Sequence, residues 1–419
     1  MLNTTEVRRH FPSLQRTQGG RPVVYFDNPA ATQVPREVID GFRNYFEQHN
    51  ANTGGAFDTS RETDQLIEQA RAAMADLLGA ASPDEISFGQ NMTSLTFQVS
   101  RALSRVIQPG DEIVLSRLDH DANVAPWLGL EEQGAVIRWI DIDPLTATLD
   151  LESAAAALSE RTRLLAVGYA SNAFGTINPV RRLTEMAHAH GAWVFIDAVH
   201  YAPHGPIDVQ DLDCDLLVCS AYKFFGPHLG ILYARRQVSE ALPVYNVQSA
   251  SKAAPHKWET GTQSYESLSG LVGVIAYLRS LSTQTEGSGR AHLRSAMTAI
   301  QQYERTLSER LLAGLTSLPA VQVYGITDLA HLDRRVPTVS FVIPGKDPAL
   351  AASELADAGI FSWAGNHYAM EPLRRLGLPA TQRIGLVHYN EMDEIDRFVE
   401  ALTRVASSAI GPHPSTVVR

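Results

Sequence analysis

Short apolar runs that alternate with longer, alanine-rich amphipathic stretches are the feature of this sequence that most limits its fold. Each run is bounded by Gly, Pro, Asp or Asn, which is typical of strands buried on both faces of a sheet. Because helices fit in the gaps between the runs, the alternation predicts an α/β fold in which helices cover both faces of a mostly parallel sheet. The runs predicted to be strands are 85–88, 112–116, 164–169, 193–197, 216–219 and 230–233.

A second, smaller unit is predicted in the last third of the chain. The segment 289–318 contains few helix-breaking residues and predicts a long helix that bridges two domains. A strand at 338–343 and helices at 348–358 and 392–406 then predict a small C-terminal α+β domain. The expected boundaries are 1–20 for an N-terminal segment packed on the small domain, 21–288 for the large domain, 289–410 for the small domain and 411–419 for a flexible tail.

The composition excludes several classes of partner. A formal charge of −11 disfavours nucleic acid, which requires clustered basic residues. No apolar run approaches the roughly 20 residues that span a bilayer, and residues 1–20 lack the apolar core of a signal peptide. The two cysteines, Cys214 and Cys219, are too few and too close for a disulfide framework, and no metal-binding spacing occurs. We therefore expect a cytoplasmic protein with no nucleic-acid partner, no membrane partner and no metal.

A lysine directly after a predicted buried strand is the strongest local signal of chemistry. Lys223 follows the strand at 216–219, within the sequence SAYKFFGP. Ligands bind at the carboxyl ends of strands in open α/β sheets, and a lysine removed from water has a lowered pKa that frees its amine for a Schiff base. The alternative is an ordinary solvated lysine in a surface loop.

An aspartate at the end of another predicted strand points to the same chemistry. Asp197 ends the strand at 193–197, 26 positions before Lys223 (223 − 197). Pyridoxal 5′-phosphate (PLP) needs a carboxylate beside its pyridine nitrogen, because the protonated ring draws electrons from the substrate. Taken alone, Asp197 could simply cap the next helix. A strand ending in Asp, followed by a strand leading into Ser-x-x-Lys, is more specific than either residue.

The turn at 89–94, with the sequence GQNMTS, joins a predicted strand to a predicted helix. Backbone N–H groups and a hydroxyl at a helix N-terminus can hold a phosphate without the lysine of a Walker motif. The turn is therefore a candidate phosphate site, although many helices simply begin with Ser or Thr.

With these residues in place, the chain resembles the class V aminotransferases of PLP fold type I, most closely their cysteine desulfurase-like branch. The resemblance runs nearly end to end. It implies PLP as cofactor, a large domain with a mostly parallel sheet of the seven-stranded type, a small C-terminal α+β domain, and a homodimer with shared active sites that acts on a small amino acid. The matching motifs are YFDNPAAT at 25–32, the turn at 89–94, DHDAN at 119–123, SNAFGT at 171–176, Asp197, Lys223, ETGT at 259–262, and Arg383 before Tyr389-Asn390.

The resemblance also implies roles for individual positions. His120 would stack on the cofactor ring, and Asn172 would donate a hydrogen bond to its phenolic oxygen. Arg383 would bind the substrate carboxylate with its forked guanidinium. The further positions that the resemblance assigns to the cofactor are Met92, Thr93, His200, Ser220 and Tyr222, together with Thr262, which would reach the phosphate bound by the partner subunit. The further positions assigned to the substrate are Asn28, Ala30, Ala31 and His367, with Asn172 again.

Several positions depart from the family pattern. Tyr368, within GNHYAMEP at 365–372, stands where cysteine desulfurases carry their nucleophilic cysteine. A phenol with a pKa near 10 cannot readily carry a persulfide. Tyr222 and His200 replace a histidine and a glutamine, and TGGA at 53–56 replaces an Arg-Gly-x-His pattern. The substrate of the relatives therefore cannot simply be transferred to this chain.

The leading hypothesis is β-elimination from a cysteine-derived amino acid, as in a C–S lyase. Lys223 would remove the α-proton once the substrate amine has displaced it from the cofactor, and Tyr368, Tyr222 or His367 would protonate the leaving group. The enzymatic alternatives are transamination, decarboxylative carbon–carbon bond formation and true cysteine desulfuration. The remaining alternative is a PLP-binding scaffold without catalysis.

Overall fold

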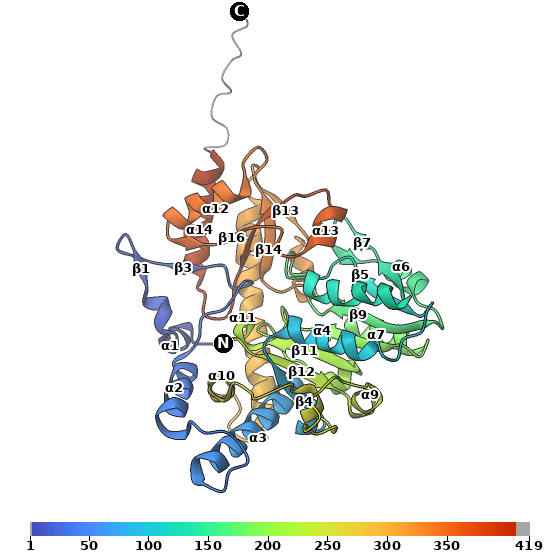
Figure 1. The fold of residues 1–419 in the computed structure, drawn as a ribbon. Coiled ribbons are helices and arrows are strands. Elements are labelled where there is room, and N and C mark those ends of the chain that lie inside the picture. The colour runs from blue at the N-terminus through green and yellow to red at the C-terminus, as the bar shows by residue number, and fades with distance from the viewer. Residues whose placement is uncertain (1, 408–419) are drawn as a thin grey trace, which may run out of the picture.

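A seven-stranded sheet forms the central layer of the computed structural model, which describes residues 2–407 (Figure 1). In order across the sheet, the strands are β4 (Ile86–Gly89), β12 (Gly230–Ala234), β11 (Leu216–Ser220), β10 (Trp193–Asp197), β9 (Thr162–Gly168), β5 (Glu112–Ser116) and β6 (Val136–Ile140). Neighbouring strands from β11 to β6 run parallel, whereas β12 runs antiparallel to both β11 and β4. The predicted α/β fold with a mostly parallel sheet is confirmed.

Alternating side chains of the central strands pack into two separate apolar layers. In β10, Val194 and Ile196 contribute to one layer and Phe195 to the other. This period of two is what a strand buried on both faces dictates. The helices that contribute to the first layer are α3 (Asp58–Leu78), α7 (Val180–His188), α10 (Tyr265–Ser280) and α11 (Gly289–Thr316), and those that contribute to the second are α4 (Met92–Leu103), α5 (Ala125–Leu128) and α9 (Arg236–Ala241).

The edge strand β6 escaped prediction. Its five residues read VIRWI, and only Ile140 is fully buried, while Val136 and Arg138 are exposed or nearly so. An edge strand covers the core with part of one face and tolerates a charged residue in the middle, which weakens the apolar signal. Six of the seven strands carried that signal because they are buried on both sides.

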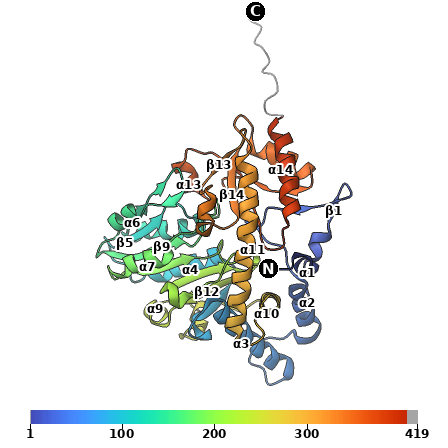
Figure 2. The same cartoon turned by 180° about the vertical axis from the view of Figure 1, so that it is seen from behind.

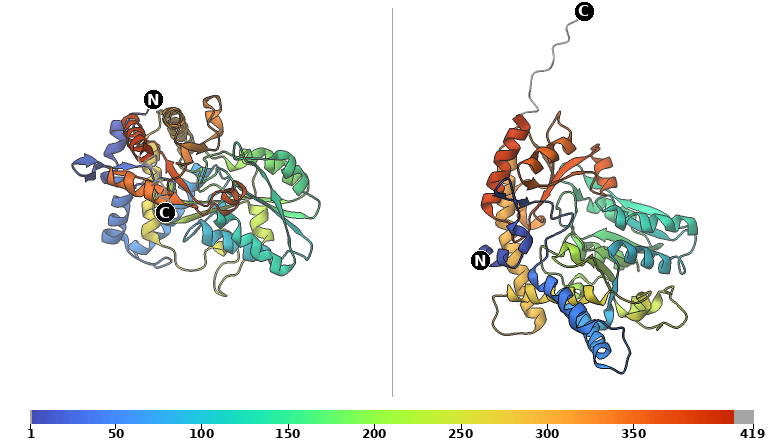
Figure 3. Two further views of the ribbon diagram at one scale, coloured as in Figure 1. Left: turned by 90° about the horizontal axis from the view of Figure 1, so that it is seen from above. Right: turned by 60° about the vertical axis from the view of Figure 1, so that its left-hand side comes forward.

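A second sheet belongs to the C-terminal part of the chain and lies beside the first (Figures 1 and 3). All of its pairings are antiparallel, in the order β13 (Gln322–Tyr324), β14 (Thr338–Val342), β17 (Thr381–Gly385) and β16 (Trp363–Gly365). Helices α12 (Pro348–Asp357) and α14 (Met392–Ser407) share its apolar core. We call this unit the small domain.

Helix α11 runs almost the full height of the molecule and joins the two units (Figure 2). Its first half, with Leu293 and Met297, packs into the core of the large sheet. Its second half, with Leu307 and Leu311, packs into the core of the small domain. The long bridging helix predicted at 289–318 therefore exists, and two hydrophobic cores fix its ends relative to each other.

The N-terminal segment crosses to the small domain. Strand β3 (Val24–Tyr25) pairs in parallel with β15 (Ile360–Phe361), and Arg8 donates to a carboxylate oxygen of Glu394 at 3.0 Å. These contacts agree with packing of the N-terminus on the small domain, while the exact boundaries at 20 and 288 stay a prediction. The tail predicted at 411–419 lies outside the described residues.

The remaining helices also contribute buried side chains to the first apolar layer. The helices are α1 (Thr4–Arg9), α2 (Arg36–Asn44), α6 (Leu151–Ala157), α8 (Val209–Leu212) and α13 (Met370–Arg375), and the strand pairs are β1 (Thr17–Gln18) with β2 (Arg21–Pro22) and β7 (Ile142–Asp143) with β8 (Thr148–Leu149). Among residues 2–407, no helix is both long enough and apolar enough to cross a membrane.

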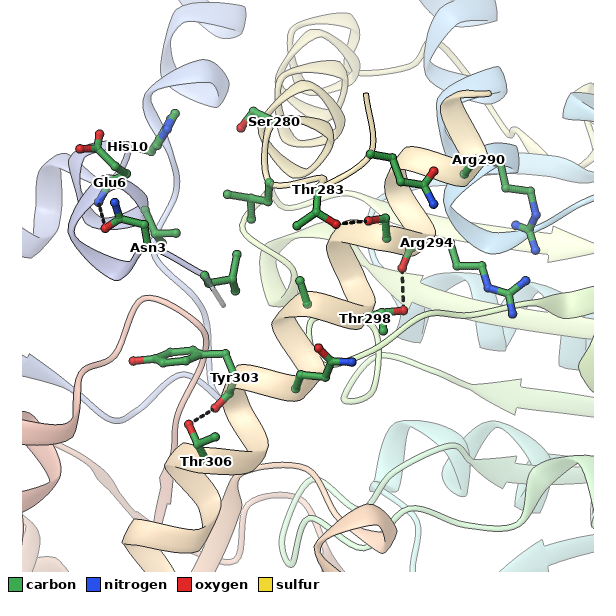
Figure 4. A pocket seen from close by; sticks show the side chains of 18 of the residues that line it. Asn3, Glu6, His10, Ser280, Thr283, Arg290, Arg294, Thr298, Tyr303 and Thr306 are labelled. Carbon is green, nitrogen blue, oxygen red and sulfur yellow. Dashed lines mark hydrogen bonds between the residues drawn. The ribbon is translucent and has the colours of Figure 1, made fainter. Parts of the chain in front are cut away.

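A groove of about 1280 Å³ opens between α1, the end of α10 and one side of α11 (Figure 4). Its lining is mixed, with Arg290 and Arg294 near one end and Tyr303 near the other. None of the residues predicted for the active site lines this groove.

A buried ion pair holds the segment before α10 against the edge of the large sheet. Arg71 on α3 donates to Glu259 at 2.7 Å and to the carbonyl oxygen of Ile86 at 2.7 Å, while the other carboxylate oxygen of Glu259 accepts the Phe88 N–H at 3.0 Å. Removing one member of a buried pair leaves the other charge without compensation, which is costly.

We therefore expect Arg71→Met to lower the free energy of unfolding by about 3–5 kcal/mol in a urea titration. Adding Glu259→Gln should recover part of the loss, because glutamine keeps an acceptor for the Phe88 N–H and carries no charge. As a control, Arg43→Met removes an exposed pair with Asp40 and should change stability by less than about 0.5 kcal/mol. Equal losses of unfolding free energy in Arg71→Met and Arg43→Met would contradict the role of the buried pair.

Candidate active site

The carboxyl ends of β10 and β11 bring the two central predicted residues together. The strands are parallel neighbours, with Asp197 opposite Val218 in the register. Asp197 is the last residue of β10, and Lys223 ends the short 3₁₀ turn (Ala221–Lys223) that follows β11. Both side chains therefore lie at the edge of the sheet where ligands bind in open α/β folds.

The Lys223 amine is held by backbone carbonyls. Its Nζ donates to the carbonyl oxygens of Pro29 at 2.5 Å and Ala30 at 2.7 Å. Burial, with a contribution from the positive charge of Arg383, lowers the pKa of Lys223 to about 7, although Asp197 and Asp27 act in the opposite direction. A substantial share of this amine is neutral near pH 7, which a nucleophile or base requires.

Asp197 is buried beneath this edge of the sheet. Burial raises its pKa to about 6, against the effects of a hydrogen bond from the Val199 N–H at 2.9 Å and of the Lys223 charge. A cation placed beside such a carboxylate would favour its ionised form.

Behind Asp197, Asp119 is also buried and accepts from the Ser116 hydroxyl and, at 3.0 Å, from the Asn123 amide. Burial raises the pKa of Asp119 to about 7, and the nearby Asp197 carboxylate contributes in the same direction. Two carboxyl groups therefore share one buried region, and the chain offers a cationic ligand group a site beside Asp197.

His120 is a neutral imidazole in this cluster. Its Nδ1 accepts the backbone N–H of Ala122 at 3.0 Å, so the ring proton lies on Nε2. Burial and the charges of Lys223 and Arg383 lower its pKa to about 3. The ring centroid lies 5.5 Å from that of Tyr368, with 30° between the ring planes. An uncharged flat ring is available to cover a planar ligand.

Asn172, His367 and Arg383 meet on the other side of the site. The Asn172 amide donates to the carbonyl oxygen of His367 at 2.8 Å, and Arg383 donates to the carbonyl oxygen of Asn172 at 3.0 Å. Burial lowers the pKa of Arg383 to about 10, and burial together with Arg383 lowers that of His367 to about 3. Arg383 is thus a buried cation, and the Asp27 carboxyl acts against the lowering of its pKa.

Four buried polar atoms of this cluster have no hydrogen-bond partner among residues 2–407: Asp27 Oδ1, Asn172 Oδ1, His367 Nδ1 and Arg383 Nε. Unsatisfied buried atoms are uncommon, and each is explained when a ligand supplies the partner. PLP and an amino acid carry an aldehyde, a phenol, a ring nitrogen, an amine and a carboxylate. The donor and acceptor set of the cluster fits these groups. The Lys223 amine, which only hydrogen bonds hold, can form an imine with the aldehyde.

The predicted phosphate turn lies next to this cluster. Helix α4 begins at Met92, whose backbone N–H donates to Ser220 Oγ at 2.9 Å, so the turn and the end of β11 are in contact. A Cβ added to Gly230 would lie 2.5 Å from the backbone of Asn91, so only glycine allows this approach. Thr93 is exposed at the first turn of the helix, where a phosphate would meet backbone N–H groups.

Other predicted residues have mixed placements. Asn28 is engaged by the protein itself, because its amide donates to the carbonyl oxygens of Tyr25 and Gly385 and supports the Pro29–Ala30 turn that holds Lys223. Ala30 and Ala31 are partly buried beside Lys223 and Tyr222. The Tyr222 ring stacks on His228 at 4.8 Å between centroids.

Of the two remaining predicted cofactor residues, His200 contacts the cluster and Thr262 does not. His200 bonds to Thr338 Oγ1 at 3.0 Å, and its pKa is lowered by burial and by the charges of its neighbours, including Arg383 and Lys223. It therefore belongs to the cluster. Thr262 is exposed in the segment before α10, and no hydrogen bond among residues 2–407 links its side chain to the cluster.

Sequence reasoning missed Asp27 and Asp119, two carboxyl groups of the site, and Arg335, a buried residue that donates to the loop carrying Asn172. Asp27 and Asp119 lie inside the motifs at 25–32 and 119–123, so their positions were visible, but a carboxyl that acts on a neighbour's charge leaves no separate pattern. Arg335 lies in a loop before β14 with no motif around it.

Comparison with known proteins shows the family. A profile of the family described as "Aminotransferase class-V" matches residues 24–398. The chain is 32% identical over 421 residues to a probable cysteine desulfurase of Mycolicibacterium paratuberculosis, covering 97% of this chain and 58% of that protein. It is 33% identical over 412 residues to a probable cysteine desulfurase of Synechocystis sp., covering 94% of both. The chain thus spans little more than half of the first relative's length.

Solved structures of cysteine desulfurases share the fold of this chain. The apo structure of a cysteine desulfurase from Thermococcus onnurineus NA1 matches with a TM-score of 0.87 and 27% identity over 97% of this chain and 99% of that one. A cysteine desulfurase structure from Escherichia coli matches with a TM-score of 0.83 and 25% identity, with the same coverage of both chains. These likenesses confirm the predicted PLP fold type I, and PLP is the cofactor on which the family depends. By fold, by the order of its motifs and by extent of match, the chain belongs to the class V aminotransferase family.

Proposed function

We propose that this protein is a PLP-dependent lyase that removes the β-substituent of a small, cysteine-derived amino acid without passing sulfur to a cysteine of its own. The observation that carries the proposal is that an exposed tyrosine, Tyr368, lies beside the site while both cysteine thiols are buried. The proposal includes a homodimer in the cytoplasm, with Thr262 reaching the phosphate of the partner subunit.

Neither cysteine is available as a nucleophile. Cys214 and Cys219 are both free and 0% exposed. Burial raises the pKa of each thiol, and the carboxylates of Asp215 and Asp197 add to the effect at Cys214 and Cys219 respectively. The thiolate is the reactive form of cysteine, so these residues are packing residues.

Tyr368 is exposed and lies on a segment that the large domain holds in place. Its side chain is 68% exposed, and its own carbonyl oxygen accepts the Asp121 N–H at 2.7 Å. Farther along the segment, Arg375 pairs with Asp141 at 2.9 Å and Glu371 with Arg117 at 2.5 Å. The backbone of this segment is therefore anchored, and the Tyr368 ring lies beside His120, a placement that suits a proton donor to a leaving thiolate.

The other residues have matching tasks. Bound PLP supplies an electron sink for a carbanion at the substrate Cα. Arg383 binds and orients the substrate carboxylate, Asp197 holds a proton on the cofactor's ring nitrogen, and His120 covers the ring. Lys223, once displaced by the substrate amine, takes the α-proton, which its lowered pKa allows near neutral pH. Tyr368 then gives a proton to the departing sulfur.

The balance of this reaction is simple. The Cα–H and Cβ–S bonds break, the thiol leaves with one proton, and water hydrolyses the remaining enamine to pyruvate and ammonia. A true cysteine desulfurase, the activity named for the relatives, would instead give alanine and transferable sulfur. Transamination would give a keto acid with an aminated cofactor, and aldol-type chemistry a new C–C bond.

The test of the function is therefore a product analysis. We expect the purified holoenzyme, supplied with L-cysteine and a series of S-substituted cysteines, to form pyruvate, ammonia and thiol in equal amounts, measured by mass spectrometry and a coupled assay. Lys223→Ala serves as the inactive control. Alanine as the product of cysteine would overturn the proposal in favour of desulfuration.

The cofactor attachment has its own test. We expect Lys223→Ala to remove the visible absorbance band of bound PLP, because no other amine in the site can form the imine. Lys252→Ala, at an exposed lysine in the segment before η7 (His256–Trp258), is the matched control and should leave the band unchanged. A band that survives in Lys223→Ala would show that the attachment point lies elsewhere.

The role of Tyr368 is tested by removing one hydroxyl. Tyr368→Phe keeps the ring beside His120 and should lower kcat by about 100-fold, the usual contribution of a positioned general acid, while the affinity for PLP stays the same. Substrates with good leaving groups should lose less, since they need no proton. Unchanged kinetics with L-cysteine would exclude this tyrosine from the mechanism.

A further inference from the structure

The loop that carries Asn172 is bound to the small domain through its carbonyl oxygens. Four successive carbonyl oxygens of this loop accept hydrogen bonds from small-domain donors, although the loop itself follows β9 of the large sheet. The pairs are Arg383 Nη1 to Asn172 O at 3.0 Å, Ser340 Oγ to Ala173 O at 2.8 Å, Arg335 Nη2 to Phe174 O at 3.4 Å, and Val336 N to Gly175 O at 2.8 Å. Loop carbonyls are ordinarily satisfied by water, so the small domain replaces the solvent here.

Arg335 is the unusual member of this set. It is 5% exposed, and its acceptors are carbonyl oxygens: Thr338 at 2.6 Å, Phe174 and Val336 at 3.4 Å, and Ile326. A buried cation that is neutralised only by dipoles is expensive to keep. Gly175 lets the loop approach the small-domain backbone closely, because it has a φ of 77° and an added Cβ would lie 2.4 Å from the Thr338 carbonyl oxygen and 2.7 Å from that of Val336.

A closed circuit of hydrogen bonds extends this connection to the Asn172 side chain. The Asn172 amide donates to His367 O at 2.8 Å, His367 Nε2 to Thr381 Oγ1 at 2.9 Å, the Thr381 hydroxyl to Ser340 Oγ at 3.1 Å, and the Ser340 hydroxyl to Ala173 O at 2.8 Å. Each hydroxyl accepts once and donates once, so all donors point the same way around the circuit. The circuit returns to the residue next to Asn172 and leaves the amide little freedom to rotate.

We propose that Arg335 is a positioning residue: by fixing the loop 171–175 on the small domain, it holds the Asn172 amide at the phenolic oxygen of PLP and in register with the carboxylate-binding Arg383. This inference rests on the proposed roles of Asn172 and Arg383. Arg335 does not touch the reacting atoms. It acts because the same loop presents one carbonyl oxygen to Arg335 and another to Arg383.

The test is the pH titration of the visible absorbance band of the holoenzyme without substrate. An amide N–H beside the phenolic oxygen stabilises its negative charge, so Arg335→Met should move the midpoint of this titration to higher pH by about one unit, the effect of losing one hydrogen bond. Ser340→Ala, which removes a single hydroxyl from the circuit, should move it in the same direction by less. Ser340→Ala also carries the test if Arg335→Met does not fold.

Lys257→Met is the matched control. Lys257 is a buried cation that likewise donates only to carbonyl oxygens, those of Ser239 and Leu242, but it lies near α9. We expect it to lower the melting temperature as Arg335→Met does and to leave the midpoint unchanged. An unchanged midpoint in both Arg335→Met and Ser340→Ala, or an equal shift in Lys257→Met, would overturn the proposal.

A second readout separates this inference from the proposed function. L-cysteine added to the holoenzyme should perturb the band, and the dissociation constant from that titration should rise about tenfold in Arg335→Met, as expected when a carboxylate site is misaligned. If L-cysteine leaves the wild-type band unperturbed, the proposed substrate class fails, while the midpoint measurement still decides the role of Arg335.

Discussion

The site depends on one physical constraint: the amine of Lys223 is withdrawn from water at the end of a buried strand and held by two backbone carbonyls. Burial favours the neutral amine, and every charge nearby must be compatible with that. The surrounding histidines are compatible with a neutral amine because they are themselves uncharged: burial keeps the pKa values of His120, His200 and His367 below their usual range. The cluster therefore combines one fixed cation, Arg383, with neutral rings and a titratable lysine.

The domain arrangement follows from the same requirement for precise placement. Lys223 and Asp197 come from adjacent strands of the large sheet, whereas Arg383 comes from β17 of the small domain. Helix α11 fixes the two units by entering both cores, and in its middle Glu304 pairs with the buried His204 at 2.7 Å. The Arg383 guanidinium, which we propose binds the substrate carboxylate, can therefore keep its distance from the Lys223 amine, and the loop at 171–175 adds a direct link between the two units.

How much of this could be predicted depended on whether the signal was local. Short apolar runs bounded by turn residues identified β10 and β11, and their ends placed Asp197 and Lys223 at one edge of the sheet, because parallel neighbours share that edge. The resemblance to a family supplied His120, Asn172 and Arg383. The charge-bearing contacts across domains could not be predicted: Arg335 and Ser340 act through backbone carbonyls more than 150 positions away in the sequence, and no pattern in their own neighbourhood marks them. The edge strand β6 escaped for a simpler reason, since half of it faces solvent.

The segment around Tyr368 connects this geometry to the choice of chemistry. A cysteine that carries sulfur away must approach the substrate and then leave with its cargo, which favours a mobile loop. Here the segment is tied down by the Asp121 N–H and by the ion pairs of Glu371 and Arg375. His367 and Tyr368 both adopt positive φ, 56° and 54°, which non-glycine residues hold only when their surroundings impose it. An anchored segment suits the proposed step, in which the protein gives a proton and keeps no sulfur.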